Sequence, residues 1–156
     1  MKQPKLYMLI GVPGSGKSTW VRNQYWAGDC AIVSTDYFVE KYAHETGRTY
    51  TEVFQDYMPI AVELMARQVS TARDNRRDII WDQTSTTVAT RKKKFKMLPD
   101  YYAIAVVFKT PDPALLAKRL ASRKGKEIPP DVLQKMIDDW EPPTEEEGFQ
   151  EIWYTS

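Results

Sequence analysis

The stretch that most constrains the fold of this chain is MLIGVPGSGKSTW, residues 8–20. Its middle, residues 11–18, matches the pattern G-x-x-x-x-G-K-[ST]. When a strand precedes such a loop and a helix follows it, the loop binds the phosphates of a nucleotide. Both neighbours are expected here, since residues 5–11 form an apolar run and residues 18–27 have helical content. The pattern therefore predicts a phosphate-binding loop rather than an ordinary glycine-rich turn.

The rest of the chain alternates short apolar runs with longer helical patterns, without an internal repeat or a low-complexity linker. Further strands are expected at residues 30–36, 77–82, 101–109 and 149–155. This alternation predicts an α/β fold, in which helices cover both faces of a parallel sheet. Ligands of such sheets bind beyond the carboxyl ends of the strands. Gly11, Asp36 and Asp82 all follow predicted strand ends, so we expect them to face one crevice.

The composition limits what this fold can bind. With 156 residues, of which 42% are hydrophobic, the chain is expected to form a single domain, residues 1–156. Its net charge of +1 gives no general attraction to a polyanion, so any nucleic-acid contact needs a local basic groove. Cys30 is the only cysteine, no apolar run could span a membrane, and the N-terminus is not signal-like. These features favour a cytoplasmic location and indicate no membrane partner.

Each residue type in the predicted loop has a task in phosphate binding. Glycines allow the backbone angles that let N–H groups converge on phosphate oxygens, and the following helix adds its positive end. Lys17 is expected to supply positive charge to the outer phosphates. The Ser18 hydroxyl is expected to bind Mg²⁺.

Two absences separate this chain from nucleotide-hydrolysing motors and from GTP switches. Motors usually follow the strand-end aspartate with a glutamate that activates water, but here Asp82 is followed by Gln83. The base-reading signature N-K-x-D is also absent. Both observations favour transfer of a phosphate over hydrolysis. Two interpretations of Asp82 stay open: a partner for magnesium or for the loop, and a helix-capping aspartate.

Asp36 ends the second predicted strand, in the sequence AIVSTD. A phosphoryl acceptor is usually an alcohol, which attacks better when a carboxylate takes its proton. A carboxylate just past a strand beside the phosphate loop could reach such an acceptor. A helix cap is the alternative, because TDYFVEKYA begins a helix, and the residues alone leave both interpretations open.

The third chemical element is the run AKRLASRKGKEIPPD, residues 117–131. Arg119 and Arg123 are four residues apart and therefore share a helix face. Arginine stabilises the charge on transferring phosphoryl oxygens, and Gly125 could be the hinge of a lid. The alternative is a solvated basic helix end, which favours the helix dipole.

Two predicted helices have a notable feature, a proline in one and a dense basic run in the other. Pro59 is expected to kink or split the helix that a capping box of Thr49 and Glu52 opens. The sequence RKKKFK, residues 91–96, is the densest basic patch of the chain. It could follow a phosphate backbone, but no motif accompanies it, so we interpret it as a solvated helix face.

Four stretches together resemble the kinase domain of phage-type 5′-hydroxyl polynucleotide kinases: GVPGSGKSTW, STDYF, WDQT and KRLASRKGKEIPPDVL. The resemblance runs from residue 6 to at least residue 140. The phosphate loop is shared with many families, whereas Ser-Thr-Asp after the second strand and R-K-G-K-x-I-P-x-D-V-L are more specific. The resemblance implies a P-loop kinase fold with a five-stranded parallel sheet and an arginine-bearing lid.

The same resemblance implies roles for individual residues. Asp36 would be the general base, Asp82 would lie in the site, and Arg123 would be the lid arginine over the transferring phosphate. The donor would be ATP with Mg²⁺, and the acceptor the 5′-hydroxyl end of single-stranded DNA or RNA. The implied nucleotide-binding residues are Gly11, Pro13, Gly14, Ser15, Gly16, Lys17, Ser18, Thr19, Arg119 and Arg123.

The sequence departs from this family at the acceptor side. The best-known members carry an arginine three residues after the base, where it binds the 3′-phosphate of the acceptor, but here that residue is Val39. Arg48, Arg91 or Lys92 could replace it. Those members also carry a 3′-phosphatase domain, which we do not expect within these 156 residues. Two other functions stay open: a small-metabolite or nucleoside kinase, and a nucleotide-dependent binding module or ATPase without an acceptor.

Overall fold

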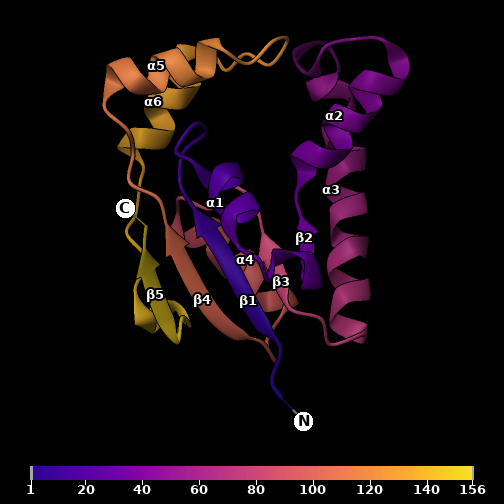
Figure 1. Cartoon of the computed structure of the whole chain (residues 1–156), viewed down its shortest axis with the longest axis vertical. Helices are drawn as coiled ribbons and strands as arrows, with labels where there is room; N and C mark the ends of the chain where they lie inside the picture. Colours follow the sequence, from indigo (N-terminus) through magenta and orange to yellow (C-terminus); the bar gives the residue numbers. More distant parts are fainter. Residues whose placement is uncertain (1, 156) are drawn as a thin grey trace.

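A computed structural model describes residues 2–155, which are built around a five-stranded parallel sheet (Figure 1). The strands are β1 (Lys5–Ile10), β2 (Ala31–Val33), β3 (Ile79–Trp81), β4 (Tyr102–Val107) and β5 (Glu151–Tyr154). Their order across the sheet is β2-β3-β1-β4-β5, and all neighbours run parallel. The predicted strands are confirmed. The phosphate loop follows β1, the middle strand. The segments that follow β2, β3 and β4 leave the sheet at the same edge, because the strands are parallel.

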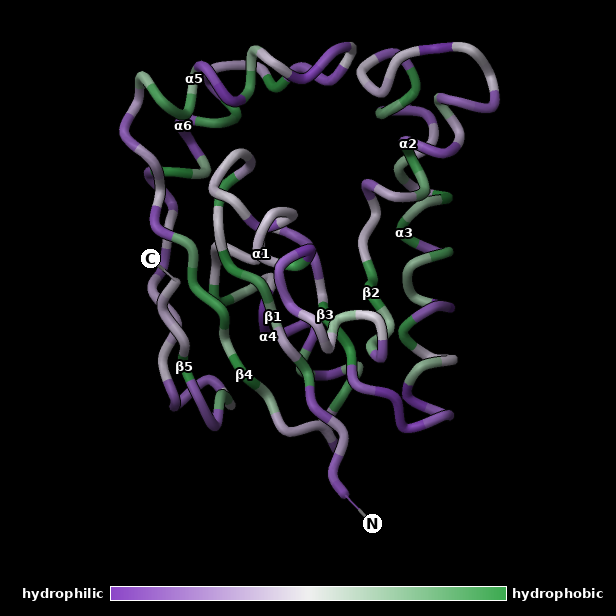
Figure 2. The backbone as a smooth tube through the Cα atoms, viewed as in Figure 1, coloured by the Kyte–Doolittle hydropathy of each residue, from purple (hydrophilic) through white to green (hydrophobic). Residues whose placement is uncertain are grey.

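Helices cover both faces of this sheet, as predicted. They are α1 (Lys17–Asn23), α2 (Thr35–Thr46), α3 (Tyr50–Asp74), α4 (Val88–Met97), α5 (Pro113–Ala121) and α6 (Pro130–Asp138), with short 3₁₀ turns η1 (Ala27–Asp29) and η2 (Glu145–Glu147). On one face, Met8 and Trp81 pack with Val69 of α3, and on the other Leu9 packs with Val21 of α1. Hydrophobic residues accordingly run along β1 and β4 through the middle of the molecule (Figure 2).

Helix α3 begins at the predicted capping box and continues through Pro59 to Asp74. The Thr49 hydroxyl accepts a hydrogen bond from Glu52 N at 3.2 Å, and the Glu52 carboxylate accepts one from Thr49 N at 2.8 Å. The expected split at Pro59 is wrong, because Pro59 lies on the exposed side of the helix. Water can bind the carbonyl that proline leaves without a donor there. None of the helices within residues 2–155 combines the length and apolar character needed to cross a membrane.

The basic patch on α4 is only partly solvated. Lys92, Lys93 and Lys96 are exposed, as interpreted, but Arg91 and Lys94 are buried. Positions 91 and 94 are three residues apart and therefore share one side of the helix, which faces the interior. The interpretation of the whole patch as a solvated face is wrong at these two positions.

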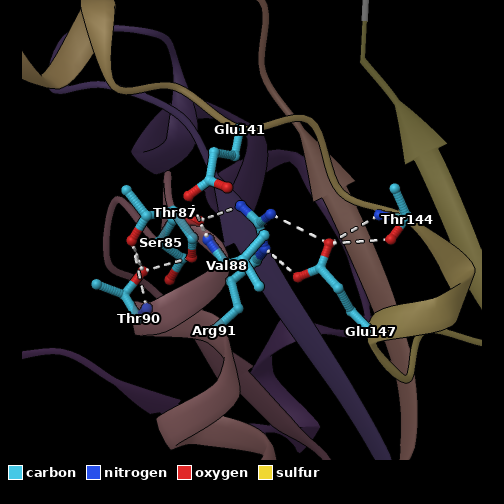
Figure 3. A network of polar contacts seen from close by, with 8 residues as sticks. All are labelled: Ser85, Thr87, Val88, Thr90, Arg91, Glu141, Thr144 and Glu147. Atoms are coloured by element: carbon cyan, nitrogen blue, oxygen red, sulfur yellow. Dashed lines mark hydrogen bonds and ion pairs between the residues drawn. The ribbon is translucent and has the colours of Figure 1, made fainter.

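Arg91 joins α4 to the chain near the C-terminus through a buried ion pair (Figure 3). Its Nε and Nη2 atoms donate to the two carboxylate oxygens of Glu147 at 2.7 and 3.1 Å. Its Nη1 atom donates to the carbonyl oxygen of Ser85 at 3.0 Å. The same Glu147 carboxylate accepts from Thr144 N at 2.8 Å. The chain leading into β5 is therefore fixed to α4 by charge as well as by apolar packing.

We expect Arg91→Met to lower the free energy of unfolding by about 3–5 kcal/mol, the usual cost of removing one partner of a buried ion pair. The Glu147 side chain is only 9% exposed and would lose its counter-charge. Urea unfolding at neutral pH measures the effect. Lys92→Met, at an exposed position of the same helix, is the matched control and should change stability by no more than about 0.5 kcal/mol. An equal effect of both variants would contradict a stabilising role for the pair.

Candidate active site

The phosphate loop between β1 and α1 is fixed from two sides. Gly14 and Gly16 have φ angles of +83° and +103°, a region that favours glycine. A Cβ atom on Gly14 would lie 2.9 Å from Leu116 Cδ1, so α5 packs directly against the loop. Gly11 N donates to the carbonyl oxygen of Thr84, after β3, at 2.9 Å. These contacts hold the loop in shape before any phosphate binds.

The other predicted loop residues lie where a phosphate could reach them. Ser18 and Thr19 are exposed in the first turn of α1, and Pro13 is half-buried in the loop. The Ser15 hydroxyl oxygen is buried and has no hydrogen-bond partner within residues 2–155. A buried hydroxyl without a partner is unfavourable, and a phosphate oxygen would supply one. The loop therefore fits a bound nucleotide.

Lys17 is placed for phosphate binding. Its ammonium group donates to the carbonyl oxygens of Gly11 and Val12 at 2.7 and 3.0 Å. Burial lowers the pKa of Lys17 to about 8, an effect that Asp82 opposes and Arg123 strengthens. A buried ammonium group next to a second positive charge is suited to receive phosphate anions.

Ser18 and Asp82 are the residues that could hold Mg²⁺. Asp82 follows β3 directly, and its interpretation as a helix cap is wrong, because Thr87 caps α4 by accepting from Thr90 N at 3.3 Å. Burial raises the pKa of Asp82, while the charge of Lys17 opposes this shift. No group of three or more metal-binding side chains occurs within residues 2–155. Mg²⁺ at nucleotide sites usually takes one or two protein groups and substrate phosphates, so these residues fit the ion.

Asp36 lies in the first turn of α2 but does not cap it. Ser34 is the cap, since its hydroxyl accepts from Tyr37 N at 3.0 Å. The carboxylate of Asp36 instead accepts from the Tyr50 hydroxyl at 2.6 Å and from Lys126 Nζ at 3.0 Å. Burial raises the pKa of Asp36, but the charge of Lys126 and these two hydrogen bonds outweigh it, and the pKa is lowered. The cap interpretation is therefore wrong, and the carboxylate is held ionised.

The two predicted lid arginines reach different parts of the site. Arg119 Nη1 donates to the carbonyl oxygen of Gly14 in the phosphate loop at 2.9 Å. Arg123 follows the end of α5 and is half-buried. Its guanidinium charge helps to lower the pKa of both Lys17 and Asp36, so Arg123 lies near both of these side chains.

Gly125, the predicted hinge of the lid, is docked onto the start of α3 in this structure. Its carbonyl oxygen accepts from Thr51 N at 2.9 Å and from Thr51 Oγ1 at 3.0 Å. A Cβ atom on Gly125 would lie 2.9 Å from Thr49 Cβ, and its φ angle is +70°. The glycine is therefore the point at which the segment between α5 and α6 docks onto the start of α3. Figure 1 shows this segment reaching across to the α2–α3 arm.

The structure excludes Arg91, one of the three residues considered in place of an arginine at position 39. Val39 is completely buried in a cluster with Ala43, Val53 and Ala61 between α2 and α3, so it cannot contact an acceptor. Arg91, one of the residues considered as its replacement, is also buried and serves the ion pair described above. The exposed candidates that remain are Arg48 and Lys92.

Three residues around Asp36 were not predicted as site residues: Glu40, Tyr50 and Lys126. Lys126 belongs to the basic run of the predicted lid, but the sequence did not indicate its contact with Asp36. Tyr50 begins α3 and carries no local signal of a role, because its contact with Asp36 depends on how α3 packs against α2. Asp36 and Lys126 both affect the pKa of Lys17, so this group lies near the phosphate loop.

These features define a P-loop kinase fold. They are the strand order, the phosphate loop after β1, and the arginine-bearing segment that contacts this loop through Arg119. A family model described as "AAA domain" matches residues 6–143, and the chain belongs to this family. Solved structures show the same fold. A candidate kinase from Chloroflexus aurantiacus J-10-fl has a TM-score of 0.73 and 17% identity, covering 99% of this chain and 86% of that one.

Two further solved structures share the fold but belong to different kinds of protein. A chain of the Pnkp1/Rnl/Hen1 RNA repair complex has a TM-score of 0.65 and 22% identity, covering 89% of this chain but only 44% of that one. Shikimate kinase from Acinetobacter baumannii has a TM-score of 0.60 and 16% identity, covering 99% of this chain and 85% of that one. At such identities, these similarities establish the shared fold and leave the acceptor open.

Proposed function

We propose that this protein is a kinase that transfers the γ-phosphate of ATP to a hydroxyl group of a second substrate. The observation that carries the proposal is the state of the Asp36 carboxylate, whose charge acts on Lys17 of the phosphate loop. This carboxylate does not cap α2 and accepts hydrogen bonds on both oxygens. A carboxylate that is fixed and ionised in this way suits the removal of a proton from an alcohol.

The surroundings of Gln83 support transfer over simple hydrolysis. Its side-chain oxygen accepts from Trp81 Nε1 at 3.0 Å, and its side-chain nitrogen donates to Thr35 Oγ1 at 3.2 Å. Both ends of the amide are therefore occupied by neighbouring residues. Hydrolytic motors carry the glutamate that activates water directly after the strand-end aspartate. Here the residue after Asp82 is Gln83, whose side chain is bound to Trp81 and Thr35.

In the proposed reaction, the acceptor oxygen attacks the γ-phosphorus while the bond to the bridging oxygen of ADP breaks. The acceptor proton passes to Asp36, and the bridging oxygen leaves with ADP. Lys17 and the loop amides bind the outer phosphates, and Arg123 stabilises the charge on the transferring oxygens. Mg²⁺, held by Ser18 and through water by Asp82, would neutralise part of the phosphate charge when bound.

We further propose that the acceptor is the 5′-hydroxyl end of single-stranded DNA or RNA. Support comes from the four sequence stretches that resemble polynucleotide kinases and from the fold shared with the RNA repair chain. Acceptor recognition must differ from the best-known members, because Val39 is buried. The half-exposed carboxylate of Glu40 would also repel a 3′-phosphate next to the reacting nucleotide.

A kinase of a small metabolite or nucleoside is the second candidate. The observation that favours it is the negative charge of the acceptor side, where Asp36 and Glu40 share one lysine, Lys126. An uncharged polyol would tolerate this surrounding better than a polyanion does. The fold is also shared with shikimate kinase.

A labelled-phosphate transfer assay distinguishes the two candidates. We expect 5′-hydroxyl oligonucleotides to be phosphorylated and a nucleoside 3′-monophosphate to be a poor acceptor. The apparent affinity for oligonucleotides should fall with salt, with a slope of about −0.7 per phosphate contact. A nucleoside and sugar set is the parallel arm. Efficient transfer to one of those compounds, with none to any oligonucleotide, would exclude the polynucleotide acceptor and leave the metabolite kinase.

A further inference from the structure

Lys126 connects the lid with the helix that carries the base. Its ammonium group donates to Asp36 Oδ2 at 3.0 Å and to Glu40 Oε1 at 2.9 Å, one turn further along α2. It also lies over the Tyr50 ring, 4.6 Å from the ring centre. The Lys126 side chain is only 16% exposed. Partial burial, two carboxylates and an aromatic face distinguish this contact from an ordinary surface ion pair.

The backbone around Lys126 is fixed to α3. Gly125, the residue before it, accepts two hydrogen bonds from Thr51. Glu127 N, the residue after it, donates to Thr51 Oγ1 at 2.8 Å. Arg123 lies three residues before Lys126 on the same short segment. The position of Lys126 therefore also restricts where Arg123 can lie.

Asp36 is held from two directions at once. Tyr50 of α3 donates to Oδ1 and Lys126 of the lid donates to Oδ2. Each carboxylate oxygen has two lone pairs, so each still has one that could accept a proton from an acceptor hydroxyl. The other charged groups near Asp36 are Glu40 on its own helix, Arg123 on the lid, and Lys17 and Asp82 across the site.

We propose that Lys126 is a positioning residue that fixes the lid arginine Arg123 and the base Asp36 relative to each other by binding the carboxylates of Asp36 and Glu40. This inference rests on the proposed kinase function. Tyr50 has the narrower task of orienting the Asp36 carboxylate from the opposite side. Lys126 thus serves both the base and the lid, whereas Tyr50 serves the base alone.

Kinetics test the effect on the reaction. Lys126→Met keeps the apolar stem and removes the charge, and it should lower kcat about 10-fold to 100-fold, the range for a charge-assisted hydrogen bond. The KM for ATP should change little, because Lys126 has no contact with the phosphate loop within residues 2–155. Lys126→Arg can still bridge two carboxylates and should recover most of the activity.

The pH profile separates positioning from a general loss of structure. Lys126 keeps the pKa of Asp36 low, so its removal should move the acid limb of kcat to higher pH. Lys124→Met is the matched control, since Lys124 is exposed on the same segment. It should leave both kcat and the limb unchanged. A lower kcat with an unmoved limb and no recovery by arginine would overturn the proposal.

Hydrogen exchange tests the lid without any need for turnover. In the protein without ligands, Lys126→Met should speed exchange at the amides of Thr51 and Glu127, whereas Lys124→Met and Tyr50→Phe should not. Unchanged exchange in Lys126→Met would refute the coupling of Lys126 to the lid, whatever the activity. If the wild type transfers no phosphate but the exchange result holds, the kinase proposal fails and the structural link stands.

Discussion

Replacing Arg123 by lysine should lower kcat by about 10³-fold to 10⁵-fold, the range for arginines that stabilise phosphoryl transfer. Lysine keeps the positive charge but loses the planar pair of donors that matches two phosphoryl oxygens. Arg123 lies near both Lys17 and Asp36, because its charge helps to lower the pKa of each. Single-turnover transfer of labelled phosphate measures the chemical step, and nucleotide binding measured separately should stay nearly unchanged.

Two comparisons make this result specific. Arg119→Lys should be impaired less, because Arg119 donates to the Gly14 carbonyl and a lysine can also donate one hydrogen bond there. Arg67→Lys is the control for replacing arginine by lysine, since Arg67 is exposed and pairs with Glu63 on the same helix, α3. Equal and mild losses at positions 119 and 123 would return this segment to its other interpretation, a solvated basic helix end.

Local signals explain what the sequence could predict. Two predicted features depend on residues within a few positions of each other: the phosphate loop and the capping box of Thr49 and Glu52. Alternation of apolar runs with helices then suffices for a parallel sheet with its functional loops at one edge. These features were predictable because the interactions that produce them join residues that are close in the sequence.

The rest of the site depends on contacts between distant segments. Tyr50 meets Asp36 across 14 residues, and Lys126 meets Asp36 across 90. Arg91 pairs with Glu147 across 56 residues, which changed its interpretation from solvated to buried. The three possible caps of α2, residues 34–36, cannot be ranked by residue type alone. Only the folded backbone shows that Ser34 caps the helix and that Asp36 does not.

The second large effect is expected for Asp36→Asn. Asparagine keeps the shape of the side chain but cannot accept the proton of an alcohol, so kcat should fall by about 10²-fold to 10⁴-fold. ATP binding should change little, because Asp36 contacts α3 and the lid rather than the phosphate loop. The wild type should lose activity as pH falls through the lowered pKa of Asp36, since a protonated carboxyl is no base. The asparagine variant should lack this limb.

Glu45→Gln is the matched control, because Glu45 is an exposed carboxylate near the other end of α2. It should leave kcat and its pH dependence as in the wild type. The thermal stability of Asp36→Asn is informative as well. Ser34 caps α2, so loss of the Asp36 charge removes a contact with Lys126 but leaves the helix capped, and Lys126 retains Glu40. A lower melting temperature with unchanged turnover would assign Asp36 to holding the lid and would remove it from the chemistry. A large loss of turnover in a protein that melts normally is the result that a general base requires.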